Sequence, residues 1–171
     1  MVEPEFRVKQ KVVCPAQGVG EIVDIIEREI AGKKQKFYMV RLFDTTLTIM
    51  VPVDSARSLG MRELVNDAQI KVILGIIGDK PSSSEGRTWN RRYRGFMEKI
   101  KTGNIFDIAE VFRDLMTLRN IKTLSFGERR MLDLARNLLV KEIAISKNWD
   151  EEKVIKEIEK PLKSKSAKGK S

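Results

Sequence analysis

The hydrophobic pattern of this chain changes its period once, near residue 61, and this change constrains the fold more than any other feature of the sequence. Before it, apolar residues are largely β-branched and alternate with polar residues or form short runs, which is typical of strands. After it, they recur every three or four residues, as amphipathic helices require. The sequence therefore predicts an α+β protein of two domains, with the strands in the first and the helices in the second.

Residues 1–60 are predicted to form a small β module. A β-branched run over 19–26 leads to a turn at Gly32, and a second run follows over 37–43. An alternating segment then stops at Pro52, which has no backbone N–H to donate to a ladder. Four or five short strands joined by tight turns favour a curled sheet of SH3-like or Tudor-like type.

Residues 61–162 are predicted to form a basic domain of about five helices, because each apolar stripe follows a residue that caps helices well. These capping signals are Asn66 or Asp67, Thr88, Asn104 with Asp107, Ser125 with Glu128, and Asn148 with Glu151. The longest helix is expected to bury one stripe of Met131, Leu134, Leu138 and Ile145. The last helix is expected to end before Pro161, and the Lys-rich tail over 163–171 to be disordered.

The positive charge of the chain lies towards its C-terminus. Overall, 33 Lys and Arg residues oppose 24 Asp and Glu residues, which gives a formal net charge of +9 and a pI near 9.7. Residues 1–66 hold 10 basic and 9 acidic residues, residues 67–162 hold 19 and 15, and the tail holds 4 and 0. A polyanion is therefore the expected partner of the helical domain.

The compartment follows from cysteine usage and from the lack of long apolar runs. The single cysteine, Cys14, cannot form an internal disulfide and is expected to be a buried small hydrophobe in a reducing environment. No apolar leader and no run of membrane-spanning length is evident. We expect a cytoplasmic, nucleoid-associated protein without a membrane partner, and a monomer satisfies every feature of the sequence.

The chain has no histidine, which removes the commonest general base, metal ligand and activator of a nucleophile. A Mg²⁺-dependent nuclease would need converging carboxylates, whereas the acidic residues here are scattered through amphipathic helices. We therefore expect a binding protein, with no catalytic residues, no cofactor and no metal site.

The segment RTWNRRYRGFMEKIK over residues 87–101 is the strongest functional signal, since it holds six basic residues and one acid with three aromatic residues between them. Cationic side chains neutralise phosphates, and an indole can stack on a base or wedge into a base step. The candidate DNA-binding residues here are Trp89, Arg87, Arg91, Arg92 and Arg94. The alternative is that Trp89 belongs to the core, as most tryptophans do; Tyr93 and Phe96 are better core candidates. Trp149 is assigned to the core.

Arg129 and Arg130 extend the basic surface into the first turn of the longest helix. The N-terminal dipole is already positive there, so a basic side chain gains nothing locally, and the placement suits a phosphate ligand. Pairing with Glu128 or Asp133 is an equally good interpretation from the sequence.

The chain resembles the CarD/CdnL family, whose N-terminal module is shared with bacterial transcription-repair coupling factors. The resemblance lies in VVCPAQGVGEIVDI at 12–25, KFYMVRL at 36–42, LTIMVP at 47–52, TWNRRYRGFMEKIKTGN at 88–104, AEVFRDL at 109–115 and LSFGERRMLDLAR at 124–136. These segments are spread over nearly the whole chain apart from the tail. No motor motif of a coupling factor is present.

The resemblance implies a Tudor-like module that binds the β subunit of RNA polymerase and a helical domain that contacts promoter DNA at the upstream edge of the bubble. In the family, a tryptophan wedges into the minor groove there and slows collapse of the open complex; Trp89 is the matching residue. Family contacts to DNA phosphates fall on Arg91, Arg94 and Arg129. The candidate polymerase contacts are Arg28, Glu29, Ile49, Met50, Val51 and Pro52. Some members carry arginine at the position of Met50.

Two other binding functions fit part of the sequence. A general nucleoid protein would use the same basic surface to compact any DNA without polymerase, but it leaves the near-neutral β module unexplained. A reader of methylated side chains would need an aromatic cage, and Phe37, Tyr38 and Phe43 cannot all converge because neighbouring strand residues face opposite ways. The family resemblance favours a regulator of transcription.

Overall fold

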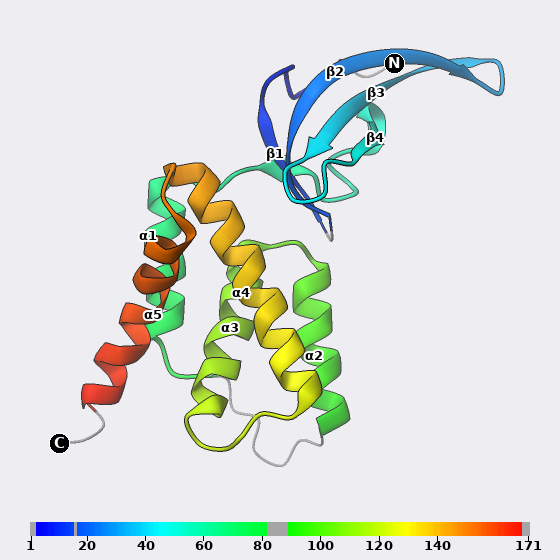
Figure 1. Cartoon of the computed structure of the whole chain (residues 1–171). Helices are drawn as coiled ribbons and strands as arrows, with labels where there is room; N and C mark the ends of the chain where they lie inside the picture. Colours follow the sequence, from blue (N-terminus) through cyan, green and yellow to red (C-terminus); the bar gives the residue numbers. More distant parts are fainter. Residues whose placement is uncertain (1–2, 16, 82–88, 169–171) are drawn as a thin grey trace. The chain divides into compact units, whose positions relative to one another are not determined.

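The computed structural model describes residues 3–15, 17–81 and 89–168, and it gives no side-chain description for residues 89, 90 and 164–168 (Figure 1). The chain divides into two compact units between Leu64 and Val65. The sequence pattern placed this boundary at residue 60. It falls later because a short strand after residue 61 still pairs within the sheet.

The first unit is an antiparallel five-stranded sheet with the order β4-β3-β2-β1-β5 (Figure 1). Its strands are β1 (Lys11–Cys14), β2 (Gly18–Ile30), β3 (Lys33–Leu42), β4 (Thr48–Pro52) and β5 (Arg62–Glu63). The predicted β module is therefore confirmed.

The β2–β3 hairpin is long and its turn is tight. Ala31 and Gly32 both have positive φ, +54° and +78°, as two-residue hairpin turns require to match the strand twist. A shift in register between Ile22 and Asp24 marks a bulge, which increases the local twist and curves β2. The sheet curls accordingly, as β2 and β3 do in Figure 1.

Tyr38 lies at the centre of the β module and is only 1% exposed. Its hydroxyl oxygen accepts hydrogen bonds from the backbone N–H groups of Glu5 (2.8 Å) and Phe6 (3.2 Å). The Phe6 ring meets the Tyr38 ring edge to face at 5.7 Å. These contacts fasten the segment before β1 to the sheet. Phe37 is buried as well, whereas Phe43 is exposed, so these aromatic side chains form no cage.

The second unit contains five helices, as predicted: α1 (Asp67–Gly78), α2 (Trp89–Lys101), α3 (Ile105–Arg119), α4 (Phe126–Lys147) and α5 (Glu151–Lys168). Asn66, Asn104 and Ser125 cap α1, α3 and α4 with their side-chain oxygens. The expected cap of α2, Thr88, lies outside the described residues. In the described part of the chain, none of the helices has the length and apolar character that a membrane crossing needs.

Helix α3 is the centre of this unit and contacts the other four helices. Its residues Ile108, Val111, Phe112 and Leu115 are at most 4% exposed. Trp149 packs half-buried against this core, in agreement with its assignment.

The buried face of α4 differs from the predicted stripe. Met131 is buried, but Leu134 is 42% exposed, and Leu138 and Ile145 are only half-buried. The buried apolar residues are instead Met131, Leu132, Ala135, Leu139, Val140, Ile143 and Ala144. The prediction was wrong because α4 packs against α2, α3 and α5 at once, so its buried face is wider than one stripe and is turned away from Leu134.

Helix α5 does not stop before Pro161. It continues through Pro161 to Lys168, so the end expected before that proline was wrong. Of the tail expected to be disordered, residues 163–168 have a helical backbone, and residues 169–171 lie outside the described residues. Leu162 packs against the helical core, and the Cβ of Pro161 lies 3.4 Å from where a Cβ on Gly78 would be. This close packing on α1 offsets the hydrogen bond that proline removes from the helix.

Two side chains of α4 anchor the start of the helical unit. The buried carboxylate of Glu142 accepts a hydrogen bond from the backbone N–H of Val65 at 2.9 Å. The hydroxyl of Ser146 donates a hydrogen bond to the backbone carbonyl oxygen of Val65. Both polar groups of a buried residue are thereby satisfied, which fixes the chain before α1.

We expect Glu142→Ala to lower the free energy of unfolding by about 1–3 kcal/mol, because it leaves the buried N–H of Val65 without an acceptor. Urea unfolding followed by circular dichroism measures this. The matched variant, Glu152→Ala on the exposed side of α5, should stay within about 0.5 kcal/mol of the native protein. Equal losses in both variants would contradict the anchoring role.

Candidate functional site

A groove of about 440 Å³ lies between α2 and the start of α4. Its lining residues are Tyr93, Met97, Phe126, Gly127, Arg130, Met131 and Leu134. Three of these apolar side chains are exposed: Tyr93 by 41%, Phe126 by 67% and Leu134 by 42%. Tyr93 was expected in the core, but the α2 side chains that pack against the core are Phe96, Met97 and Ile100.

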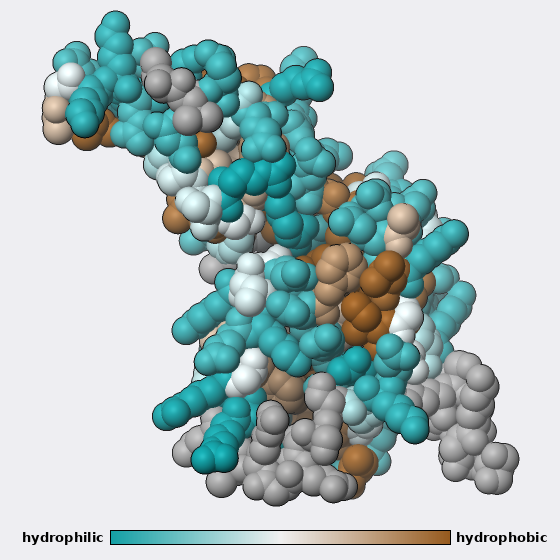
Figure 2. Space-filling model, turned by 180° about the vertical axis from the view of Figure 1, so that it is seen from behind, coloured by the Kyte–Doolittle hydropathy of each residue, from teal (hydrophilic) through white to brown (hydrophobic). Residues whose placement is uncertain are grey.

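Cations accompany the exposed aromatic side chains of the groove. The guanidinium of Arg130 lies over the ring of Phe126, 5.6 Å from its centroid. Apolar side chains also reach the surface elsewhere on the helical unit, as Figure 2 shows from behind, and exposure alone is ordinary. The combination of exposed rings and arginines is what suits nucleic acid, because bases stack on rings while cations neutralise phosphates.

The arginines predicted to bind DNA lie on both helices of the groove. Arg91 and Arg94 on α2 are exposed, as are Arg129 and Arg130 on α4. Arg92 is half-buried, and its Nε is buried without a hydrogen-bond partner, so it is less accessible than its neighbours.

The backbone of α2 begins at Trp89, one helical turn before Tyr93. Positions four apart lie on the same side of a helix, so position 89 extends the row that Tyr93 and Met97 form along the groove. The side chain of Trp89 and the whole of Arg87 lie outside the described residues.

The acids that were alternative partners of Arg129 and Arg130 are engaged elsewhere. The Glu128 carboxylate accepts from the Ser125 backbone N–H at 2.9 Å and pairs with Lys122 at 3.1 Å. Asp133 lies 3.6 Å from Arg136. The arginines of the first turns of α4 thus keep their positive charge available at the surface.

The pKa of the Glu128 carboxyl reflects these contacts. Burial disfavours its charged form, but the hydrogen bonds from Ser125 and Lys122 outweigh burial, so its pKa lies below the ordinary value of 4.5. The carboxylate is therefore ionised at neutral pH and completes the capping box that starts α4.

The β module carries a second candidate surface at its edge. Strand β4 ends the sheet order and pairs only with β3 among the described strands. Met50 on β4 is 41% exposed, and Ile49 and Pro52 are half-buried. Val51 was a candidate polymerase contact, but it is only 8% exposed and belongs to the core, so its side chain is not part of this surface.

Arg28 and Glu29 are exposed but lie on a different part of the sheet from β4. They pair in register with Gln35 and Lys34, beyond the last β3–β4 pair, which joins Phe37 and Pro52. The predicted polymerase contacts are therefore divided between the far part of the β2–β3 hairpin and the β4 edge.

Four exposed apolar residues were missed by the sequence reasoning: Phe43 and Leu47 beside β4, and Phe126 and Leu134 at the groove. Phe126 had a detectable signal, because it stands at the first helical position after a capping serine, outside the apolar spacing of α4. Phe43 and Leu47 had none, since their pattern is that of strand ends.

The described residues give little support to reactive chemistry. Burial raises the pKa of the Cys14 thiol to about 11, so it stays protonated and unreactive at neutral pH. Over the part of the chain that the structure describes, no three Cys, Asp or Glu side chains are grouped to hold a metal ion.

Two family models match the chain: CarD-like/TRCF RID domain over residues 6–65, and CarD, C-terminal domain over residues 72–159. YdeB of Bacillus subtilis (strain 168), named as a candidate transcription factor, is 33% identical over 149 residues, which cover 87% of this chain and 97% of YdeB. Both the strands and the helices are thus matched.

Two solved structures from Myxococcus xanthus also match. CdnLNt is 36% identical, with 39% of this chain and 94% of that chain covered and a TM-score of 0.32. The 72-residue N-terminal domain of CarD, solved by NMR, is 30% identical, with 37% and 84% covered and a TM-score of 0.31.

The lowered pKa of Glu128 predicts a pH-dependent stabilisation. The folded-state pKa lies below the unfolded-state value near 4.5, so the stabilisation is present above that pH and is lost as pH falls through the folded-state pKa. Glu128→Gln should therefore unfold about 1–2 kcal/mol more easily at pH 7, with the difference shrinking below pH 4.5. Thermal unfolding at both pH values measures this. As a control, Glu152→Gln should keep the free energy of unfolding within about 0.5 kcal/mol of the native value at both pH values. If the destabilisation by Glu128→Gln did not change with pH, the lowered pKa of Glu128 would be contradicted.

Proposed function

The chain belongs to the CarD/CdnL family of transcription factors, and on that premise we propose that it binds the β subunit of RNA polymerase and promoter DNA together and stabilises the open complex. The β module would hold polymerase, and the α2–α4 groove would hold the upstream edge of the bubble. The observation that carries the proposal is the exposed ring of Phe126 with the guanidinium of Arg130 over it, in the same groove as Tyr93 and Met97 of α2.

Promoter DNA suits the α2–α4 groove in its charge and in its aromatic side chains. Arg94 and Arg129 form no ion pair with the described residues, and each is exposed. They would neutralise phosphates on either side of the groove. Trp89 and Phe126 would supply flat apolar faces to the minor groove or to an unstacked base step, a use of aromatic side chains that does not depend on base sequence.

A protein partner suits the β4 edge. Residues 1–66 have 10 basic and 9 acidic side chains, so the β module has no electrostatic reason to bind DNA. Edge strands leave backbone N–H and C=O groups for another strand to pair with. Met50, with the exposed Leu47 next to β4, would add adaptable apolar contact to such a strand.

Stabilisation of the open complex requires only that the protein bind it more tightly than the closed complex. The equilibrium then shifts by the difference in affinity, and about 1.4 kcal/mol corresponds to tenfold. Attachment to polymerase would raise the local concentration of the groove near the promoter, so weak binding to DNA alone suffices. Tight binding to any duplex without polymerase would instead favour the alternative of a general nucleoid protein.

The first test is the lifetime of an open complex formed by the cognate polymerase. The native chain should lengthen this lifetime. Trp89→Ala and Phe126→Ala should each reduce the increase in lifetime by at least about fivefold, which corresponds to the loss of one stacking contact. Val72→Ala removes another exposed apolar side chain, on α1, and should leave the lifetime unchanged. The proposal fails if the native chain has no effect on the lifetime.

Binding to the isolated β subunit tests the other half of the proposal. Met50→Glu should weaken it by roughly tenfold or more, because a charge replaces apolar contact at the edge strand. Gln17→Glu adds the same charge at the β1–β2 turn, at the other side of the sheet, and should bind as the native chain does. Equal weakening by both variants would place the contact elsewhere.

A further inference from the structure

A second cavity, of about 620 Å³, lies at the corner where α3 ends and α4 begins, separate from the α2–α4 groove in its lining residues. Four cations line it: Arg119, Lys122, Arg129 and Arg136. Asp133 is the one acid in the lining. The volume falls in the range of small-molecule sites, roughly 300–1,000 Å³.

The positive charge of this corner pocket is only partly neutralised. Lys122 pairs with Glu128, but Arg119 and Arg129 form no hydrogen bond or ion pair with the described residues. Arg119 is in the last turn of α3, where the helix dipole favours a cation, whereas Arg129 is in the first turns of α4, where it does not. Two charges thus face the cavity without a counter-ion.

Arg136 is the third cation of the pocket, and its neighbours neutralise its positive charge only in part. Its Nη1 lies 3.6 Å from Asp133, beyond hydrogen-bond distance, and its Nη2 is 3.9 Å from the sulfur of Met116, a weak acceptor. Its Nε is buried without a hydrogen-bond partner. The ion pair with Asp133 therefore compensates this guanidinium, which is 24% exposed, only over a long distance, and part of its positive potential remains at the cavity.

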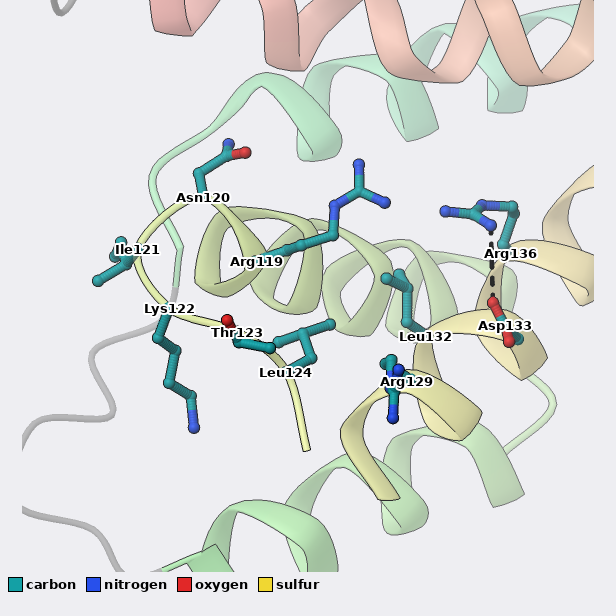
Figure 3. A pocket seen from close by; sticks show the side chains of 10 residues that line it. All are labelled: Arg119, Asn120, Ile121, Lys122, Thr123, Leu124, Arg129, Leu132, Asp133 and Arg136. Carbon is teal, nitrogen blue, oxygen red and sulfur yellow. Dashed lines mark ion pairs between the residues drawn. The ribbon is translucent and has the colours of Figure 1, made fainter. Parts of the chain in front are cut away.

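Two of the arginines, Arg119 and Arg136, extend in the same direction (Figure 3). In Figure 3 the guanidinium groups of Arg119 and Arg136 extend to the same side of the pocket, with Leu132 between them, whereas Lys122 and Arg129 extend to the other side. Two like charges facing one space repel each other, and an anion between them would turn that repulsion into attraction.

We infer that the corner pocket binds a phosphate group through Arg119 and Arg136. Guanidinium forks match phosphate oxygens in a bidentate manner, and two forks on one side suit a group with several anionic oxygens. The phosphate has two possible sources, a free polyphosphate compound and the DNA backbone.

With a free polyphosphate as ligand, this pocket goes beyond the proposed function; with the DNA backbone as ligand, it rests on that function and adds a second DNA contact to it. Arg129 lines the corner pocket and is also a candidate contact to promoter DNA, so it cannot separate the two. Arg119 and Arg136 have no part in the α2–α4 groove. The lifetime assay with Trp89→Ala and the pocket assay with Arg119→Gln can therefore fail independently.

The test is a titration of the nitrogen-15-labelled 171-residue chain at fixed salt, with inorganic triphosphate in one arm and a short DNA duplex in the other. The side-chain Nε–Hε resonances of Arg119 and Arg136 are followed. Both should shift saturably in at least one arm. A response to triphosphate identifies a free polyphosphate as a source, and a response to the duplex alone identifies the DNA backbone.

Variants separate a built site from general charge attraction. Arg119→Gln and Arg136→Gln should each weaken the responding probe roughly tenfold, the loss of a charge-assisted hydrogen bond. Lys156→Gln removes the same charge from an exposed position on α5 and should change affinity less than about twofold. Because Arg119 is exposed, its variant keeps the fold even if Arg136→Gln does not. No shift in either arm, or equal weakening by Arg119→Gln and Lys156→Gln, overturns the inference.

Discussion

The buried carboxylate of Glu128 organises the corner on which both candidate nucleic-acid features depend. It closes the capping box with Ser125 and pairs with Lys122, so it fixes the start of α4 against the loop after α3. With this acid engaged, Arg129 and Arg130 remain available at the surface. One interaction thus sets the direction of a helix and also decides which charges face solvent.

The proposed function assigns an unlike partner to each of the two units, and the surfaces of the units differ accordingly. The β module is close to neutral, and its strand β4 has an edge that no other described strand pairs with; under the proposed function this edge would bind another backbone through hydrogen bonds. The helical unit concentrates arginines and exposed rings, which under the proposed function would recognise a polyanion through charge and stacking. Neither surface needs high affinity of its own when both engage one complex, because each raises the effective concentration of the other.

Much of the fold could be predicted because its signals are local. The order of strands and helices follows from the two hydrophobic periods, and Asn66, Asn104 and Ser125 each marked a helix start that the structure confirms. The family resemblance was equally visible, since its motifs are contiguous stretches of sequence. The basic and aromatic character of α2 was likewise readable from residues 87–101 alone.

The sequence by itself determined which elements form and where the arginines lie along the chain, because period, caps and charge runs act between near neighbours. Only the tertiary structure decided which of those arginines are neutralised, why Leu134 is exposed, and how α5 continues through Pro161. These outcomes depend on contacts between residues far apart in the sequence, such as Pro161 against Gly78. Burial and charge compensation are properties of the packed neighbourhood, and that neighbourhood exists only once the helices have assembled.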